Sequence, residues 1–179
     1  MISIESNKLL LRELNLNDVT DKYVSWLNDP KVNQYIESRL VSQTHKSIQK
    51  FIKEVNQDPY DVLLGIFIKK NMLHIGNIKI SSTSKDRIHK RASIGFIIGE
   101  KEEWGKGYAT EAIKVITKYG FNNLHITKIC AGCRESNIGS KKAMVKAGYK
   151  VEGFFNSHFE TPKGREGGWQ LGILVDQYA

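Results

Sequence analysis

The sequence lacks the features of disulfide-rich, secreted or membrane-spanning chains. It holds only 2 Cys and 3 Pro among 179 residues, too few cysteines for a disulfide framework. Its longest apolar runs, at 62–68 and 94–98, are far shorter than the roughly 18–20 residues of a membrane span. The opening MISIESNKLLLRE has an early acid and no apolar stretch before a small-residue cleavage site, unlike a secretory signal. We therefore expect a single domain over 1–179, cytoplasmic and without a membrane partner.

The charge balance favours anionic partners. The chain carries 27 basic and 19 acidic residues, a formal net charge of +8, and its pI is near 9.4. The basic residues are spread along the sequence and form no run of about five or six, so a nucleic-acid-binding tail is not indicated. No helix-turn-helix, zinc-finger or ribonucleoprotein aromatic pattern is present either. We therefore expect phosphorylated small molecules rather than nucleic acid.

Apolar periodicity and turn residues predict the elements of the fold. Strands are predicted at 9–14, 62–69, 73–81, 91–98, 127–133, 151–155 and 169–175. Helices are predicted at 19–27, 32–35, 44–55, 107–120 and 137–147. Polar loops are expected at 82–90 and around 161–164. This order predicts an α/β domain with a mixed sheet, in which the helix between 91–98 and 127–133 makes a right-handed parallel crossover.

The segment WGKGYAT, residues 104–110, connects a predicted strand to a predicted helix. Unpaired N–H groups point out of the start of a helix and attract phosphate, and two glycines let the backbone approach an anion closely. A dinucleotide fingerprint would need glycine in place of Thr110 and an acidic ribose partner about 20 residues later, which is absent. A G-x-x-x-x-G-K-[ST] loop fails too, because Glu100 and Gly107 stand where Gly and Ser or Thr are required.

These residues resemble motif A of the Gcn5-related N-acetyltransferase (GNAT) superfamily, [QR]-x-x-G-x-[GA], with Trp104 as a departure at the first position. A second landmark of that family is Asn137-x-x-Ser140, which opens a helix ending in Ala147-Gly148-Tyr149. The string WGKGYATEA, with WLNDP at 26–30, looks like the branch of ribosomal-protein-alanine and amino-sugar acetyltransferases. The resemblance implies a GNAT-like fold: a central, mostly antiparallel sheet with a splayed parallel pair and helices on both faces.

The resemblance also implies acetyl-CoA as co-substrate. Its pantetheine arm would bond to the backbone at the end of the strand 91–98, and its pyrophosphate to the N–H groups of 105–110. The residues expected to bind coenzyme A are Ile97, Ile98, Gly99, Trp104, Gly105, Lys106, Gly107, Tyr108, Ala109, Thr110, Asn137 and Ser140. No metal is expected, because Cys130 and Cys133 point to opposite faces of a strand and no further ligands are suitably spaced.

In such a site an amine attacks the thioester directly, and a backbone N–H near Ile98 would stabilise the oxyanion. Met144 stands where many family members carry a tyrosine acid, and the resemblance implies Ser140 as the acid that protonates the thiolate, because it occupies the position that serves as the acid in the ribosomal branch. Ser140 and Asn137 would also fit purely structural roles at the helix start. In some N-terminal acetyltransferases a glutamate takes the proton of the amine, but Gly132 stands at that position here. The candidate general bases are therefore Glu100, His158 and Glu160.

The acceptor is expected to contact the segments 28–43 and 156–169. The residues expected to bind it are Trp26, Tyr35, Glu37, Arg39 and Glu160. Acidic Glu37 and Glu160 would suit the ammonium of a protein N-terminus, whereas arginines with an aromatic floor would suit a nucleotide-linked amino sugar. The sequence does not decide between these two acceptors. It also does not decide whether the protein is a monomer or a homodimer. The alternative function is a catalytically silent CoA-binding or protein-interaction module on the same fold.

Overall fold

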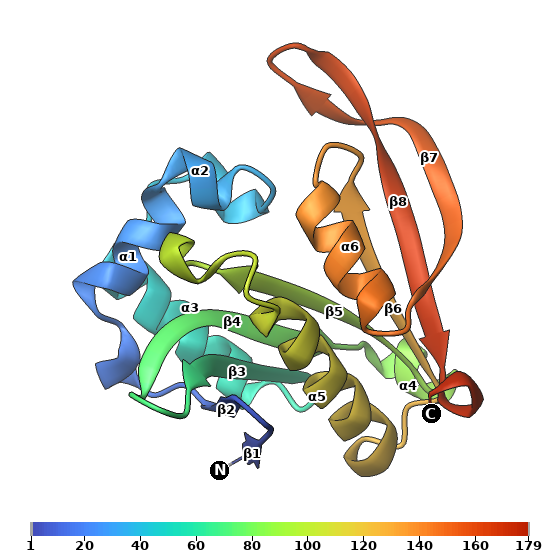
Figure 1. The fold of residues 1–179 in the computed structure, drawn as a ribbon, viewed down its shortest axis with the longest axis horizontal. Coiled ribbons are helices and arrows are strands. Elements are labelled where there is room, and N and C mark those ends of the chain that lie inside the picture. Colours follow the sequence, from blue (N-terminus) through green and yellow to red (C-terminus); the bar gives the residue numbers. More distant parts are fainter. Residues whose placement is uncertain (1, 179) are drawn as a thin grey trace.

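The computed structural model describes residues 2–178, and its strands form one sheet in the order β1-β2-β3-β4-β5-β6-β8-β7 (Figure 1). Neighbouring strands are antiparallel except β5 and β6, which are parallel. The strands are β1 (Ser3–Glu5), β2 (Leu9–Glu13), β3 (Asp61–Ile68), β4 (Leu73–Ser81), β5 (Arg91–Ile98), β6 (Lys128–Arg134), β7 (Lys150–Thr161) and β8 (Gly164–Leu174). The predicted mixed sheet is thus confirmed.

The helices begin where the sequence supplies capping side chains. The Thr44 hydroxyl accepts a hydrogen bond from the Ser47 N–H, and the Ser47 hydroxyl accepts one from the Thr44 N–H, which starts α3 (His45–Gln57). The other helices are α1 (Asp21–Asn28), α2 (Pro30–Asn33), α4 (Ser84–Ile88), α5 (Tyr108–Asn123) and α6 (Ile138–Lys146), with 3-10 turns η1 (Leu16–Asp18), η2 (Glu37–Leu40), η3 (Lys101–Glu103) and η4 (Val175–Gln177). Within residues 2–178, no helix has the length and apolarity that crossing a membrane requires.

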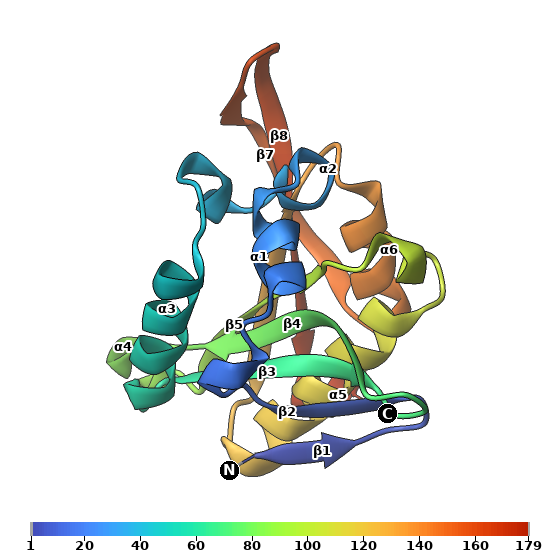
Figure 2. The same cartoon turned by 90° about the vertical axis from the view of Figure 1, so that its left-hand side faces the viewer.

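Two hydrophobic cores lie on opposite faces of the sheet. Along β3, Leu64 and Ile66 belong to the core that holds α5 and α6, whereas Leu63 and Phe67 belong to the core that holds α1 and α3. Successive side chains of a strand point to opposite faces, so these two sets mark the two sides of the sheet. Figure 2 shows α3 and α6 at opposite sides of the molecule. The expectation of helices on both faces is confirmed.

The C-terminal hairpin is longer than the sequence predicts. Pairing of β7 with β8 continues to Thr161↔Gly164, so the prediction of a polar loop containing 161–164 is wrong except for a two-residue turn. At that turn, the Thr161 hydroxyl donates to the Gly164 carbonyl at 2.7 Å. The hairpin projects beyond the body of the sheet, and its outer half is mostly exposed (Figures 1 and 2). It therefore lacks the apolar alternation by which a strand is recognised.

Two short elements were also missed. β1 pairs three residues with β2, and α4 lies inside the expected loop 82–90. Both are too short for a periodic apolar pattern. A local signal for α4 does exist, since Thr83 and Asp86 form a reciprocal capping box.

The parallel strands β5 and β6 separate early. Their register runs only from Arg91↔Lys128 to Ser93↔Cys130, although the strands continue to Ile98 and Arg134. Figure 1 shows them diverging beyond this point. The crossover between them passes through α5, as predicted. The splayed pair leaves one edge of β5 without a strand partner in the described part of the chain.

Candidate active site

The open edge of β5 presents backbone groups from alternate residues. The Gly99 N–H donates to the Ile75 carbonyl at 2.8 Å, and the alternation of an antiparallel ladder then directs Ile97 toward β4 as well. The N–H and C=O groups of Ile98 and Phe96 consequently face the opening. Of the three residues predicted to bond the pantetheine arm, Ile98 lies there, while Ile97 and Gly99 bond within the sheet. Phe96 was missed, although a two-residue step back from Ile98 would have found it.

The turn that follows β5 holds its glycines in left-handed conformations. Gly105 has φ +77° and Gly107 has φ +88°, and no atom lies within 4 Å of a Cβ built at either position. Glycine is therefore required by backbone conformation rather than by crowding. Gly107 caps α5 without a side-chain bond, and the first helical bond runs from the Glu111 N–H to its carbonyl at 3.1 Å. The N–H groups of residues 108–110 are left without helical partners, as an anion site requires.

Two exposed side chains near this turn, Lys106 and Trp104, form hydrogen bonds within the protein. Lys106 Nζ contacts Glu103 Oε2 at 2.9 Å, and this hydrogen bond raises the pKa of Lys106. The Trp104 indole N–H donates to the Ile98 carbonyl at 2.7 Å, while the side chain remains 46% exposed. Trp104 thus joins the glycine turn to the open edge of β5. Residues 104–107 are exposed and residues 108–110 are half-buried, with Tyr108 packed against the core.

The second family landmark lies at the start of α6. Asn137 Oδ1 accepts a hydrogen bond from the Ser140 N–H at 3.1 Å, so Asn137 caps the helix. Ser140 is half-buried, and no hydrogen bond of its hydroxyl is found within residues 2–178. Met144 is fully buried in the core. Tyr149 is also buried and its hydroxyl lies 2.8 Å from that of Thr117, which joins the end of α6 to α5.

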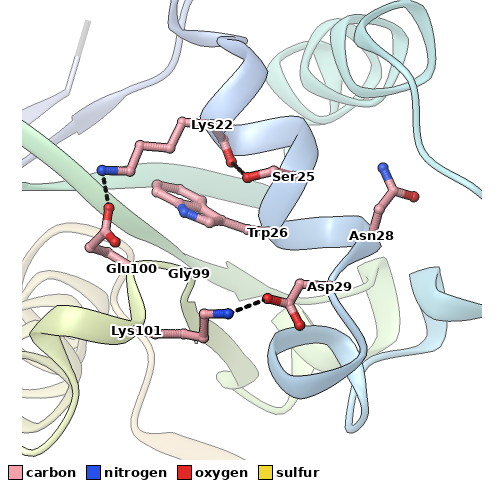
Figure 3. A pocket seen from close by; sticks show the side chains of 8 residues that line it. All are labelled: Lys22, Ser25, Trp26, Asn28, Asp29, Gly99, Glu100 and Lys101. Atoms are coloured by element: carbon pink, nitrogen blue, oxygen red, sulfur yellow. Dashed lines mark hydrogen bonds and ion pairs between the residues drawn. The ribbon is translucent and has the colours of Figure 1, made fainter.

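A cleft of about 420 Å³ lies between α1 and the end of β5 (Figure 3). Glu100 lines it and forms an ion pair with Lys22 of α1, and Lys101 Nζ contacts Asp29 at 2.5 Å. Trp26 forms the cleft wall and is only 5% exposed. A Cβ at Gly99 would come within 2.1 Å of its ring, so the strand end packs directly on the indole.

The other candidate bases lie elsewhere. His158 and Glu160 are exposed on the projecting hairpin, where His158 contacts Phe155 and Phe159 through its ring. Glu160 lies 4.0 Å from Arg165 of the paired strand. The structure therefore places Glu100 next to the end of β5 and places the hairpin residues away from it.

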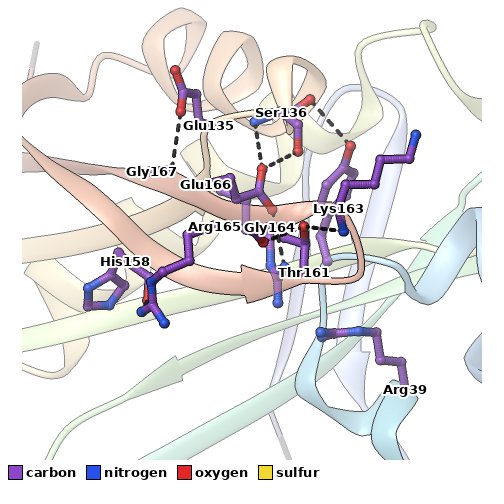
Figure 4. A network of polar contacts seen from close by, with 12 residues as sticks. Arg39, Glu135, Ser136, His158, Thr161, Lys163, Gly164, Arg165, Glu166 and Gly167 are labelled. Atoms are coloured by element: carbon purple, nitrogen blue, oxygen red, sulfur yellow. Dashed lines mark hydrogen bonds and ion pairs between the residues drawn. The ribbon is translucent and has the colours of Figure 1, made fainter.

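The segment just after β6 is bonded to β8, where the Ser136 hydroxyl donates to Glu166 (Figure 4), and Tyr35 and Glu37 approach the same region. The Tyr35 hydroxyl donates to the Ser136 carbonyl at 3.3 Å, and Glu37 Oε1 lies 3.9 Å from Arg134 and also 3.9 Å from Arg39. Arg134 is buried and bonds Glu166 of β8 at 3.1 Å. Sequence reasoning missed Arg134 and Glu166. An arginine closing the otherwise mostly apolar strand KICAGCR was the available signal for Arg134.

The two cysteines are both free thiols. Cys133 is buried in the core with α5 and α6, whereas Cys130 is half-buried on the other face, and burial raises the pKa of both thiols. Within residues 2–178, no three His, Cys, Asp or Glu side chains are grouped in a way that would hold a metal ion.

The fold and site define a class of protein: an α/β domain with an open strand edge beside a helix start whose first N–H groups lack helical partners. The chain matches the Acetyltransferase (GNAT) domain family over residues 8–150, and it therefore belongs to that family. It is 29% identical over 181 residues to the uncharacterized N-acetyltransferase p20 of Bacillus licheniformis, covering 99% of this chain and 94% of the relative. It is 30% identical over 163 residues to the uncharacterized N-acetyltransferase YnaD of Bacillus subtilis (strain 168), covering 91% and 90%.

Solved structures share the fold. A GNAT-family acetyltransferase from Bacillus anthracis has a TM-score of 0.83 at 22% identity, covering 98% of this chain and 99% of that one. The spermidine N-acetyltransferase from Vibrio cholerae, solved in complex with CoA and spermine, has a TM-score of 0.83 at 20% identity, covering 96% and 98%. At these identities the likeness shows the GNAT fold alone, which confirms the fold implied by the sequence.

Proposed function

We propose that this protein transfers an acetyl group from acetyl-CoA to a primary amine. One observation carries the proposal: the glycine turn with unpartnered N–H groups is joined to the open edge of β5 by the bond from the Trp104 indole to the Ile98 carbonyl. A diphosphate bound at the turn would direct the attached arm along that edge. The family assignment and the N-acetyltransferase relatives support the same reaction.

The donor would occupy the opening on the side of α5 and α6. Its diphosphate accepts from the N–H groups of residues 105–110, and its pantetheine amides bond Phe96 and Ile98 as an added strand would. This assignment is supported by the direction of those backbone groups. Asn137 contributes by fixing the start of α6, and with it the Ser140 backbone, in the place where the proposal needs the Ser140 hydroxyl to reach the thioester.

The reaction would be a direct transfer. The amine nitrogen bonds to the carbonyl carbon of the thioester, and the Ile98 N–H stabilises the oxyanion that forms. The carbon–sulfur bond then breaks, and the thiolate takes the proton of the Ser140 hydroxyl, which in turn regains one from the amide nitrogen as that nitrogen loses its second proton. The incoming ammonium must first lose a proton. Glu100 is the proposed base, because its carboxylate lies in the cleft beside the end of β5.

The acceptor would approach from the opposite face, between α1, η2 and the hairpin. Both a protein N-terminus and a small-molecule amine fit an entrance that carries Tyr35, Glu37 and Arg39. One structural relative is named a spermidine N-acetyltransferase, which makes small amines a reasonable first panel.

Thiol release from acetyl-CoA with a panel of amines tests the proposal. We expect amine-dependent release of coenzyme A, slowed in Ser140→Ala with its affinity for CoA retained. Calorimetric binding of CoA without turnover on any amine would instead favour a catalytically silent CoA-binding module. Absence of CoA binding would contradict both functions.

A further inference from the structure

Arg134 occupies a position across the opening from the thioester site. Ser93 of β5 and Cys130 of β6 are the last pair of the parallel register. Arg134 lies four residues past Cys130 and Ile97 lies four residues past Ser93, so the two residues lie at the same level on the separated strands. The neighbouring Cys133 points into the core with α5 and α6, so the alternation of β6 turns Arg134 to the opposite face. This is the face on which η2 and the hairpin approach, and it is the proposed acceptor side.

The guanidinium of Arg134 is buried but incompletely bonded. The residue is only 7% exposed, and its Nη1 donates to Glu166 Oε1 at 3.1 Å. Its Nε is buried without a hydrogen-bond partner within residues 2–178. The Phe159 ring lies 4.7 Å from the guanidinium carbon and closes another side. Buried polar groups are normally satisfied, so the unpartnered Nε indicates a place for an oxygen-bearing group that the chain itself does not supply.

The carboxylate of Glu37 lies near the Arg134 guanidinium without a hydrogen bond to it. Glu37 Oε1 lies 3.9 Å from Arg134 Nη2 and 3.9 Å from Arg39 Nη1, distances too long for hydrogen bonds. The Glu37 side chain is 74% exposed, so solvent surrounds most of it. A carboxylate thus faces two guanidinium groups without being fixed by either.

We propose that the acceptor is an amine that also carries a carboxylate, and that Arg134 and Arg39 bind this carboxylate where Glu37 now stands. The inference rests on the proposed acetyltransferase function and adds the substrate class. The exposed Glu37 side chain swings into solvent, and its place is taken by a ligand carboxylate whose two oxygens suit the planar guanidinium donors. The amine of the ligand then extends toward the thioester at Ile98.

Charge also separates this class of acceptor from polyamines. An acceptor with a second cationic group in place of the carboxylate would bring that group toward Arg134 and Arg39, where it is repelled. Two carboxylates offset these charges: Glu37 is mostly exposed and is the one displaced by the ligand, whereas Glu166 is already bonded to Arg134 and to the Ser136 hydroxyl at 2.6 Å. It is therefore not free to receive an ammonium.

Lysine and 1,5-diaminopentane form a matched pair for the test, because they differ only by the carboxylate. Phenylalanine and phenethylamine form a second pair with one amine each. We expect kcat/KM to be at least about tenfold higher for the carboxylated member of whichever pair is acetylated, mainly through KM. Arg134→Gln should abolish that preference, while Arg134→Lys should restore part of it.

Two variants separate recognition from folding. Arg39→Gln removes a bond from Arg39 Nη1 to the Ile36 carbonyl at 3.2 Å in the short η2 turn, so it should reduce the preference with only a small loss of thermal stability. Arg91→Gln removes the same charge at the far end of β5, where Arg91 pairs with Asp86, and should leave the preference unchanged. The Michaelis constants for acetyl-CoA should remain within about twofold in all of these variants, since the donor lies on the other face.

The outcomes are distinguishable. Acetylation of both members of a pair with equal kcat/KM, or a preference that survives in both Arg134→Gln and Arg39→Gln, would overturn the carboxylate site and leave the acetyltransferase function intact. Binding of CoA with no acetylation of any amine would overturn the proposed function, and the carboxylate site with it.

Discussion

At the scale of single residues, Trp104 is the clearest departure from the family motif. Its indole N–H bonds the Ile98 carbonyl, which faces the open edge where an added strand would pair. An incoming pantetheine amide would need the same carbonyl oxygen, on which the indole already takes one of two acceptor positions and so weakens the second bond. Trp104 also precedes the glycine turn in the chain, so replacing it should affect the binding of the donor at the proposed site.

We expect Trp104→Phe to bind CoA about fivefold more tightly, because a competing hydrogen bond of about 1 kcal/mol is lost while the aromatic ring is kept. Isothermal titration calorimetry with CoA measures the change. Trp169→Phe serves as control, because that indole lies beneath Lys141 rather than against β5. Weaker binding by Trp104→Phe would mean that the indole supports the turn instead of competing with the ligand.

At the scale of elements, one capped helix start lies away from the opening between β5 and β6, and another lies at it. Thr44 caps α3, which packs on the core away from the opening, whereas Asn137 caps α6 at the opening itself. The two caps use similar chemistry, since each side-chain oxygen accepts from a backbone N–H three residues later. They therefore provide a matched pair for separating stability from catalysis.

Thr44→Ala and Asn137→Ala should each lower the unfolding free energy by about 1 kcal/mol. Only Asn137→Ala should also lower kcat, because the N–H that it leaves unbonded belongs to Ser140. Urea denaturation and steady-state thiol release measure the two effects. Equal losses of activity in both variants would show that activity follows stability and not the placement of Ser140.

The sequence was sufficient for the elements with strong local signals. The crossover helix, its glycine turn and the cap at Asn137 were all readable, because each depends on residues close together in the chain. Arg134 with Glu37 and Glu166 was not, since packing alone brings these distant positions together. The length of the hairpin was underestimated because exposed strands carry no apolar alternation.

At the scale of the whole molecule, one histidine in a desolvated aromatic cluster links stability to pH. His74 of β4 lies in the aromatic cluster on the face of α1, stacked on Phe67 at 4.6 Å and against Trp26 and Tyr23. Desolvation lowers its pKa below the ordinary 6.5, although a bond to Asn77 opposes the shift. The unfolded chain therefore binds a proton below pH 6.5 that the folded protein resists.

We expect the unfolding free energy to fall as the pH is lowered through 6.5, because proton binding then favours the unfolded state. Urea midpoints between pH 8 and pH 5 (about the range of histidine titration) measure this fall. His74→Gln should remove it, whereas His158→Gln on the exposed hairpin should not. An unchanged fall in His74→Gln would assign the pH dependence to other groups.

The central claim is that the N–H groups of residues 105–110 bind the diphosphate of coenzyme A, and calorimetry with CoA on Gly107→Val tests it most directly. Valine is strained at φ +88°, so the turn must change shape. Gly164→Val imposes similar strain at φ +111° in the distant hairpin turn and serves as control. The account predicts at least about tenfold weaker binding for Gly107→Val and unchanged binding for Gly164→Val. Wild-type affinity in Gly107→Val, or no binding of CoA by the wild-type protein, would contradict it.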